Sequence, residues 1–397
     1  MEKPFDFAFF PEVRYDHLLR GRTGALIDNL QKRGFYIYYF EKPPDSLLQY
    51  YKDPIAYSRG LRRFLFPKPI IFKNMKVFPQ PPIFPAKRFN KGLLKQYNHN
   101  IVNHRINEKY TEIVKTRKKP VVALVVTPWW YDIIEKMNFE FLCYDCIDDL
   151  KIFCEAKELE HFNVRQKQLV KKSDLILISA KKLKDEIQKI KNDAPIEYLP
   201  NGVDAQFFID KVVSATIPED LKTLPKPIIG FIGSIFNWVD IPLIKKTAER
   251  FTNATVVLIG PVQGVRTPRS PNIVHLGPKP YSSIPAYINN FDVCLIPFIA
   301  DPLSEKVDPI KVYEYLALGK PVVAINLPEL EKMKDLIYLA KDNDDFITAI
   351  NKALIENNQE LIMKRVQYAK ENSWDVRVSD LLNILTNQLS AKFGNIQ

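Results

Sequence analysis

The chain has 397 residues, of which 46% are hydrophobic and 26% are charged, so it can bury an ordinary core and is too long for one average domain. Its apolar runs fall short of the roughly 18 residues that a membrane-spanning helix needs, and its first residues lack a signal-peptide cleavage pattern. Four cysteines are too few for a disulfide framework, so we expect a cytoplasmic protein.

One segment accounts for the whole net charge of +11. Residues 54–107 contain eleven lysines and arginines, no aspartate or glutamate, and interleaved aromatic residues. Each cation near an anionic membrane contributes about 1 kcal/mol, and aromatic rings settle among the headgroups, so we expect this segment to dock on the inner membrane surface. A solvated basic face with its aromatic rings in the core is the alternative. Nucleic acid would also attract such charge, but we find no nucleic-acid-binding motif.

The first half of the chain alternates predicted strands and helices, a pattern that builds a parallel sheet with helices on both faces. The expected elements are a strand over 5–10, a helix over 18–33 ending at Gly34, strands over 35–40, 120–127 and 139–144, a helix over 155–172, and a strand over 175–179. Turn residues 198–204 and a linker to about residue 226 then mark a domain boundary.

The second half repeats this alternation and predicts a second doubly wound sheet. Its expected strands are 228–232, 255–259, 272–276, 293–297 and 321–325, and its expected helices are 241–251, 284–290 and 309–318. We place the domains at residues 1–205 and 206–375, and we expect the helix over 376–397 to cross back to the first domain. The predicted fold class is therefore α/β with two Rossmann-like domains that face a central cleft.

A glycine turn follows the first strand of the second domain. Gly233 allows the backbone to approach a ligand closely, and the amides of the turn and of the next helix start favour a phosphate. The segment is not the G-x-G-x-x-G fingerprint, so a simple tight connection is the alternative.

Residues 308–323 define a short helix and a strand. Asp308 is expected to cap the helix, Pro309 fits its first position, and Gly319 fits its end. Lys311 and Glu314 then share one face near the helix start, where a cation suits a diphosphate and a carboxylate can accept hydrogen bonds from ribose hydroxyls. A plain ion pair between the two residues is the alternative.

Three carboxylates, Asp145, Asp148 and Asp149, follow an apolar strand of the first domain. Ligands bind at the carboxyl ends of such strands, and clustered acids raise one another's pKa, so one of the three could act as a base toward an acceptor hydroxyl. Capping of the next helix by Asp148 or Asp149 is the alternative. Cys143 and Cys146 form a C-x-x-C pair without a second pair, so we expect no zinc there.

The loop over 11–22 follows the first strand and also opens on the predicted cleft. Four of its side chains could anchor an acceptor diphosphate, and a solvated loop is the alternative; they are Arg14, His17, Arg20 and Arg22.

These motifs together resemble the GT-B glycosyltransferases, especially family-4-like (group 1) enzymes of bacterial surface-polysaccharide synthesis, including teichuronic-acid and exopolysaccharide types. The resemblance covers nearly the whole chain and is more specific for fold and reaction class than for substrate. The segments that carry it are Lys32-Arg-Gly34, Tyr144-Asp-Cys-Ile-Asp-Asp149, Pro200-Asn-Gly-Val-Asp204, Gly230-Phe-Ile-Gly233, Val274-His-Leu-Gly277 with Tyr281, Lys311 to Val323, and Ser373-Trp374.

The resemblance implies that the first domain binds the acceptor and the second binds a nucleotide-sugar donor. Lys311 would bind the diphosphate, Glu314 the ribose, and the backbone around Pro278 and Lys279 the base. Further implied donor contacts are Gly233, Ser234 and Ile235 on the phosphate side, and Ile310. One departure is Lys306, where many relatives carry a glutamate that contacts the sugar.

The expected activity is metal-independent transfer of a hexose-type sugar, with no cofactor, from a UDP-sugar or a similar donor to a lipid-linked acceptor. Lys311 and the three aspartates are its candidate catalytic residues, and we expect the anionic membrane, not nucleic acid, as a further partner. Two rival classes are a non-catalytic membrane- or nucleic-acid-binding module with this fold, and a GT-B phosphorylase or epimerase.

Overall fold

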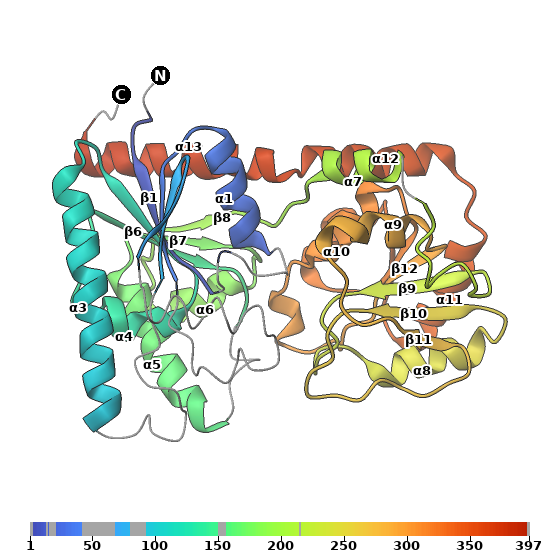
Figure 1. Ribbon diagram of the computed structural model, residues 1–397. Helices are drawn as coiled ribbons and strands as arrows, with labels where there is room; N and C mark the ends of the chain where they lie inside the picture. Colours follow the sequence, from blue (N-terminus) through green and yellow to red (C-terminus); the bar gives the residue numbers. More distant parts are fainter. Residues whose placement is uncertain are drawn as a thin grey trace.

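The computed structural model describes residues 3–12, 15, 21–41, 68–79, 93–149, 156–213 and 216–394. These residues form two α/β domains, each built on a largely parallel sheet, and the domains lie side by side under one long helix (Figure 1). Most strands are buried along their whole length, which explains why their sequences are continuous apolar runs rather than alternating ones.

The first sheet has eight strands in the order β3-β4-β2-β1-β5-β6-β7-β8. All neighbours are parallel except β3, which pairs antiparallel with β4 at the edge. The strands are β1 (Asp6–Phe10), β2 (Ile37–Phe40), β3 (Ile70–Phe72), β4 (Met75–Phe78), β5 (Val121–Val125), β6 (Phe141–Cys146), β7 (Leu175–Ile178) and β8 (Ile196–Tyr198). The helices of this domain are α1 (Arg22–Lys32), α3 (Leu93–Thr116), α4 (Tyr131–Ile134), α5 (Ala156–Lys172) and α6 (Leu183–Ile190).

The second sheet is parallel throughout, in the order β11-β10-β9-β12-β13-β14. Its strands are β9 (Ile228–Ile232), β10 (Thr255–Ile259), β11 (Ile273–His275), β12 (Val293–Ile296), β13 (Val322–Ile325) and β14 (Tyr338–Ala340). Its helices are α7 (Ala205–Val213), α8 (Ile241–Arg250), α9 (Ile284–Asn289), α10 (Ile310–Ala317), α11 (Asn343–Leu354) and α12 (Gln359–Glu371).

Helix α13 (Trp374–Phe393) runs from the second domain back over the first, where the two chain ends lie near each other (Figure 1). Leu381, Leu385 and Leu389 are buried in the core cluster that also contains Phe5 and Phe7 of the first domain. The last helix therefore completes the core of the first domain, and it joins the two domains a second time.

The basic segment contributes to the first sheet in a way that the sequence analysis missed. Strands β3 and β4 lie inside it, and Met75, Val77 and Phe78 of β4 are buried core residues. Ile71 and Phe72 of the edge strand are exposed, at 72% and 40%. The predicted docking residues at 54–67 and 80–92 lie outside the described residues.

One predicted helix cap is wrong. Asp308 does not cap α10, because Pro309 holds the cap position and the Asp308 carboxylate is engaged elsewhere, as described below. The next described helix, α5, begins at Ala156, so it is not capped by Asp148 or Asp149, and residues 150–155 lie outside the described residues. Gly319 ends α10 as predicted, with a φ of +66° that favours glycine.

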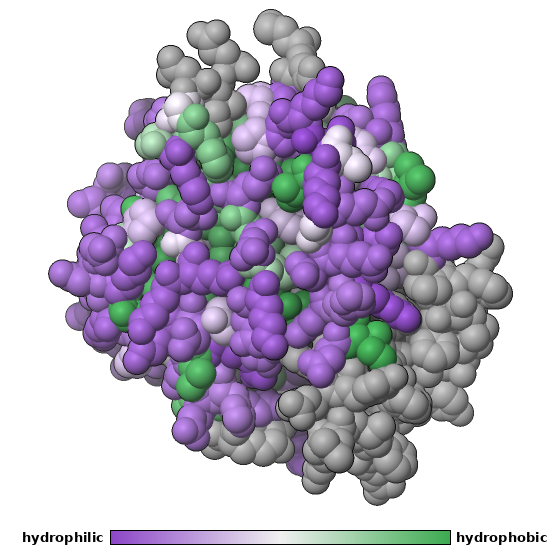
Figure 2. All heavy atoms as spheres, turned by 90° about the vertical axis from the view of Figure 1, so that its left-hand side faces the viewer, coloured by the Kyte–Doolittle hydropathy of each residue, from purple (hydrophilic) through white to green (hydrophobic). Residues whose placement is uncertain are grey.

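Figure 2 views the first domain from the side of α3, where hydrophilic side chains cover most of the described surface and hydrophobic ones stand singly or in small groups. Such scattered apolar side chains are ordinary for a face in contact with water. None of the described helices is both long and apolar enough to cross a membrane.

Candidate active site

A cavity of about 260 Å³ lies between the two domains. Its walls come from loops that follow the carboxyl ends of three strands: Asp148 and Asp149 after β6, Gly233 and Ser234 after β9, and Phe298 after β12. Open α/β sheets bind ligands at this end of their strands. The remaining lining residues are Asn201, Phe231, Ile232, Trp238, Leu303, Ser304, Val307, Asp308, Pro309, Ile310 and Lys311.

The second-domain wall brings a glycine turn next to a helix start. Gly233 and Ser234 line the cavity beside Lys311 of α10. The Ile232 backbone N–H donates to the Tyr315 hydroxyl over 2.9 Å, which ties α10 to the end of β9. Lys311 therefore lies beside a turn whose Ile232, Gly233 and Ile235 N–H groups already donate within the protein, so the cation is the part of this wall that suits a diphosphate.

Two predicted donor contacts take separate positions around α10. Lys311 Nζ donates to Glu314 Oε2 over 2.7 Å, so the ion pair that we considered as the alternative is present. Lys311 lines the large cavity, with 28% of its side chain exposed, whereas the buried Glu314 lines a small neighbouring cavity with Gly21 and Tyr281. Ile310 lines both cavities.

Three further donor predictions are not placed at the cavity. The Ile235 side chain is fully buried in the core of the second domain and does not line it. Pro278 and Lys279 lie after β11 and are not lining residues of either cavity, and Lys279 Nζ donates to Asp220 Oδ2 over 2.6 Å. A base contact through the backbone near Lys279 stays a prediction.

Asp145 and Arg22 form a buried ion pair. Arg22 donates from Nε and from a terminal nitrogen to the two Asp145 oxygens, both over 3.0 Å, and the two side chains are 0–2% exposed. Arg22 also donates to the Pro200 carbonyl and to Asn201 Oδ1. Both side chains are therefore buried and engaged, an arrangement that does not favour the predicted roles of Asp145 as a base and of Arg22 as an anchor for an acceptor diphosphate.

Asp149 is also held by a partner from elsewhere in the chain. Lys306 Nζ donates to Asp149 Oδ2 over 2.8 Å and lies 3.6 Å from Glu186 Oε1 of α6. Lys306 belongs to the second domain and both carboxylates to the first, so this cluster bridges the domains.

Asp148 is the one of the three predicted aspartates that fits a base. It lines the cavity and is partly exposed. Burial raises the pKa of Asp148 to about 7, with contributions from Asp308, Glu12 and Asp149, although the positive charge of Arg22 opposes the shift. A carboxyl group with this pKa can take up a proton near neutral pH.

Glu12 joins these acids, and the sequence analysis missed it. Its carboxylate accepts hydrogen bonds from the Thr23 hydroxyl over 2.9 and 3.1 Å, and burial raises its pKa. It lies in the loop after β1, from which only basic side chains were predicted to act. The other predicted acceptor ligands of that loop, Arg14, His17 and Arg20, lie outside the described residues.

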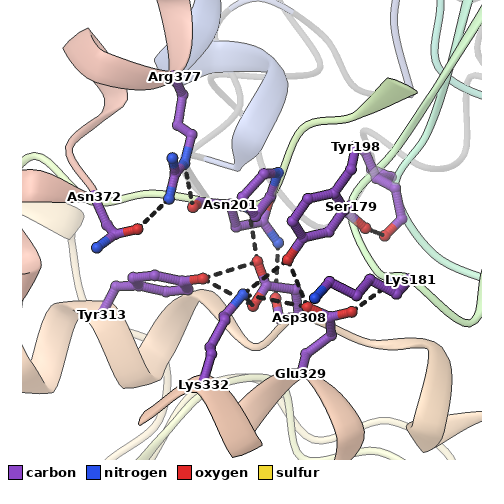
Figure 3. Close-up of polar contacts among 12 residues, drawn as sticks. Ser179, Lys181, Tyr198, Asn201, Asp308, Tyr313, Glu329, Lys332, Asn372 and Arg377 are labelled. Atoms are coloured by element: carbon purple, nitrogen blue, oxygen red, sulfur yellow. Dashed lines mark hydrogen bonds and ion pairs between the residues drawn. The ribbon is translucent and has the colours of Figure 1, made fainter. Parts of the chain in front are cut away.

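A polar network around Asp308, which lines the cavity, joins the two domains (Figure 3). The Asn201 backbone N–H donates to Asp308 Oδ2, and the Asn201 side-chain amide donates to the Asp308 carbonyl, both over 2.7 Å. Tyr313 and Lys332 donate to the Asp308 carboxylate over 3.0 and 3.2 Å, and Arg377 Nε donates to the Asn201 carbonyl over 3.0 Å. Burial raises the pKa of Asp308, and Lys332 opposes that shift. The network therefore fixes the start of α10 against the first domain.

Glu329 extends this network through contacts that the sequence did not suggest. It accepts a hydrogen bond from the Tyr198 hydroxyl over 2.6 Å and another from Lys332 over 3.2 Å. For this network the only signal in the sequence was that Asn201 and Asp308 each belong to a motif named in the sequence analysis.

Within the described ranges, no three histidine, cysteine, aspartate or glutamate side chains gather as a group that could hold a metal ion.

Comparison with known sequences finds a family match within the second domain. Residues 226–356 match the family described as glycosyl transferases group 1. The chain is also 29% identical over 258 residues to TuaH of Bacillus subtilis (strain 168), a teichuronic acid biosynthesis glycosyltransferase whose name marks that role as provisional. This match covers 60% of the chain and 65% of TuaH, which is less than two thirds of that relative's length.

Solved structures match the chain over nearly its whole length. A sucrose-phosphate synthase from Thermosynechococcus elongatus has a TM-score of 0.68 at 12% identity, with 98% of this chain and 99% of that chain covered. An α,α-trehalose 6-phosphate synthase from Burkholderia multivorans has a TM-score of 0.67 at 10% identity, with 99% and 100% covered. At such identities the likeness establishes the fold alone. The chain therefore has the GT-B fold, and its residues 226–356 match the glycosyl transferases group 1 family.

Proposed function

We propose that the protein is a glycosyltransferase that moves a hexose-type sugar from a nucleotide-diphosphate sugar, such as a UDP-sugar, to a membrane-associated, lipid-linked acceptor in surface-polysaccharide synthesis. The observation that carries this proposal is the cavity between the domains. One of its walls presents Lys311 beside the Gly233 turn, and the opposite wall presents Asp148. The group 1 domain and the likeness to TuaH support the same reaction class.

The proposed reaction uses the two walls in different steps. The bond between the sugar's anomeric carbon and the diphosphate oxygen breaks, and that oxygen keeps the electron pair. Lys311 and the Ser234 backbone N–H stabilise the charge that develops on it. The acceptor hydroxyl oxygen bonds to the anomeric carbon, and Asp148 takes up the hydroxyl proton.

Metal independence is part of the proposal. A lysine and backbone amides can offset the charge of a diphosphate, which is the task that a divalent cation performs in other transferases. The measurement that checks it is turnover in the presence of EDTA. Activity that vanished with EDTA and returned with Mn²⁺ would contradict this part while leaving the reaction class intact.

We also propose a cytoplasmic location at the inner membrane face, reached through the basic segment of the first domain. Three observations support it: the eleven cations of residues 54–107, the exposed lysines Lys68 and Lys73, and the exposed apolar side chains of Ile71 and Phe72 between them. Cations and apolar side chains on one edge suit a surface of anionic lipid.

The test of the reaction is release of a free nucleoside diphosphate. Thermal-shift screening of nucleotide sugars would first identify a stabilising donor, and the purified protein would then be incubated with that donor and a bacterial lipid extract. We expect nucleoside diphosphate release that depends on the extract, together with a glycosylated lipid product. Donor binding without release would favour the non-catalytic module, and consumption of phosphate or interconversion of donors would favour a phosphorylase or an epimerase.

A further inference from the structure

The end of the cavity beyond Lys311 is where the donor's sugar would lie, if the proposed function holds. Lys311 and the Gly233 turn occupy the diphosphate position. Glu314, the expected ribose contact, lines the separate small cavity on the other side of Ile310. A nucleotide sugar extends in opposite directions from its diphosphate, so the sugar points toward Asp148 and Ser304.

The charged residues that line the cavity are predominantly acidic. Asp148, Asp149 and Asp308 line it, and among the lining residues that the structure describes Lys311 is the single cation. Three other cations, Arg22, Lys306 and Lys332, are already engaged with Asp145, Asp149 and Asp308. Since the diphosphate uses Lys311, no second cation among the described lining residues is left for another anionic group.

Ser304 provides a neutral contact at the same place. It lines the cavity, is 1% exposed, and its hydroxyl has no hydrogen-bond partner among the described residues. A buried hydroxyl without a partner costs about 1–3 kcal/mol, so a ligand hydroxyl that pairs with it gains that energy. Sugar hydroxyls can both donate to and accept from a serine.

We infer that the sugar end of the cavity selects an uncharged hexose and excludes a uronic acid. The carboxylate of a uronate would lie among Asp148, Asp149 and Asp308 without a cation of its own, whereas a hydroxymethyl group carries no such penalty. Lys306, which stands where many relatives carry a glutamate, acts indirectly by partly neutralising Asp149. It is thus a positioning residue for this selectivity.

A matched pair of ligands tests the inference, because UDP-glucose and UDP-glucuronate differ only at carbon 6 of the sugar. Calorimetric titration at about pH 8, where Asp148 is ionised, should give a Kd for UDP-glucuronate about tenfold or more above that for UDP-glucose. UDP alone is the reference. If GDP binds in its place, GDP-mannose and GDP-mannuronate form the equivalent pair. Equal or tighter binding of the uronate would overturn the inference.

Two variants with opposite expected signs sharpen the test. Asp148→Asn removes a carboxylate and should lower the ratio of the Kd for UDP-glucuronate to the Kd for UDP-glucose about threefold or more. Lys306→Met leaves the Asp149 charge without its partner and should raise this ratio. Asp344→Asn, an exposed acid that pairs with Lys246 on the second domain, should leave the ratio unchanged. The Kd of UDP reports in each variant whether the donor site is intact. Unchanged ratios in both cavity variants would also overturn the inference.

The outcome separates this inference from the proposed function. A protein that binds neither UDP nor GDP, nor any of their sugars, contradicts the proposed function and the inference together. A protein that binds the diphosphate and both sugar nucleotides equally contradicts only the inference.

Discussion

The two walls of the cavity hold their charged side chains in different ways. On the second-domain wall, Lys311 pairs with Glu314, three residues along the same helix, and stays partly exposed. In the first domain, Asp149 on the cavity wall is held by Lys306, and Asp145, which does not line the cavity, is held by Arg22. These partners are 157 and 123 residues away, and both carboxylates are almost fully buried. A partly exposed lysine can exchange its partner for a phosphate, whereas the buried carboxylates are set when both domains fold.

This contrast implies that substitutions on the two walls have different consequences. Changes to the buried ion pairs of Asp145 and Asp149 should chiefly affect folding and the relation of the domains, because buried charges lose their partners. Changes on the second-domain wall should chiefly affect turnover, because Lys311 is expected to stabilise the leaving group.

The largest expected effect is on folding. Arg22→Met leaves Asp145 as a buried, unpaired carboxylate, and it should lower the free energy of unfolding by about 3–5 kcal/mol in urea denaturation followed by circular dichroism. The double variant Arg22→Met with Asp145→Leu should recover part of that loss. Lys245→Met removes the exposed pair with Glu249 and is the control, with an expected loss of about 1 kcal/mol or less. Equal small losses in both single variants would contradict the assignment.

The next effect is on turnover. Lys311→Ala should lower kcat by about 10²–10³-fold, and lower donor affinity by no more than that, because the diphosphate charge is greater in the transition state. Single-turnover release of the nucleoside diphosphate measures the change in rate, and calorimetry measures the change in donor affinity. Lys245→Ala, an exposed lysine of α8, is the matched control and should change neither. An unaltered kcat in Lys311→Ala would remove this lysine from the mechanism.

Asp308 tests the connection between the walls. Asp308→Ala removes the acceptor of Asn201, Tyr313 and Lys332, and it should lower the free energy of unfolding by about 1–3 kcal/mol. Asp308→Asn keeps an acceptor oxygen and should retain about half of that energy. Because the network fixes the start of α10, donor affinity should fall more in Asp308→Ala than in Asp308→Asn. Stability loss with unchanged donor affinity in both would confine Asp308 to a structural role.

A smaller effect concerns pH. If Asp148 is the base, kcat/KM should fall about tenfold per pH unit below about 7 and level off above it, because only the ionised carboxylate accepts the proton. Asp148→Asn should lower kcat/KM and abolish this acidic limb. Asp344 is exposed, and Asp344→Asn should keep the pH dependence of kcat/KM unchanged. A limb that survives in Asp148→Asn would assign the titration to another group.

The smallest expected effect lies outside the cavity, on the edge of the first domain. Changing Lys68 and Lys73 to Gln should weaken binding to vesicles with anionic lipid by about 1 kcal/mol per charge at low salt, measured by co-sedimentation. Ile71→Ser should weaken the part of the vesicle binding that persists at high salt. Met363 is an exposed apolar residue of the second domain, and Met363→Ser should not weaken that binding. Equal binding to anionic and zwitterionic vesicles, unaltered by these changes, would identify the basic segment as a solvated face.

Features that depend on neighbouring residues could be predicted from the sequence. The apolar runs predicted the two parallel sheets, and the spacing of Lys311 and Glu314 predicted that they share a face of α10, because helix geometry alone decides it. Strands β3 and β4 were missed because they are short and lie among lysines and prolines, where charge obscures the apolar pattern.

The sequence by itself determined the fold class, the glycine turn after β9 and the second-domain wall, because each arises from contacts within one short segment. The tertiary structure decided which of three neighbouring aspartates is accessible. Asp145, Asp148 and Asp149 are chemically identical in the sequence, and only the arrival of Arg22 and Lys306 from distant segments engages two of them. Burial and charge are properties of the folded surroundings, so the pKa of Asp148 and its candidacy as the base could not be predicted from spacing.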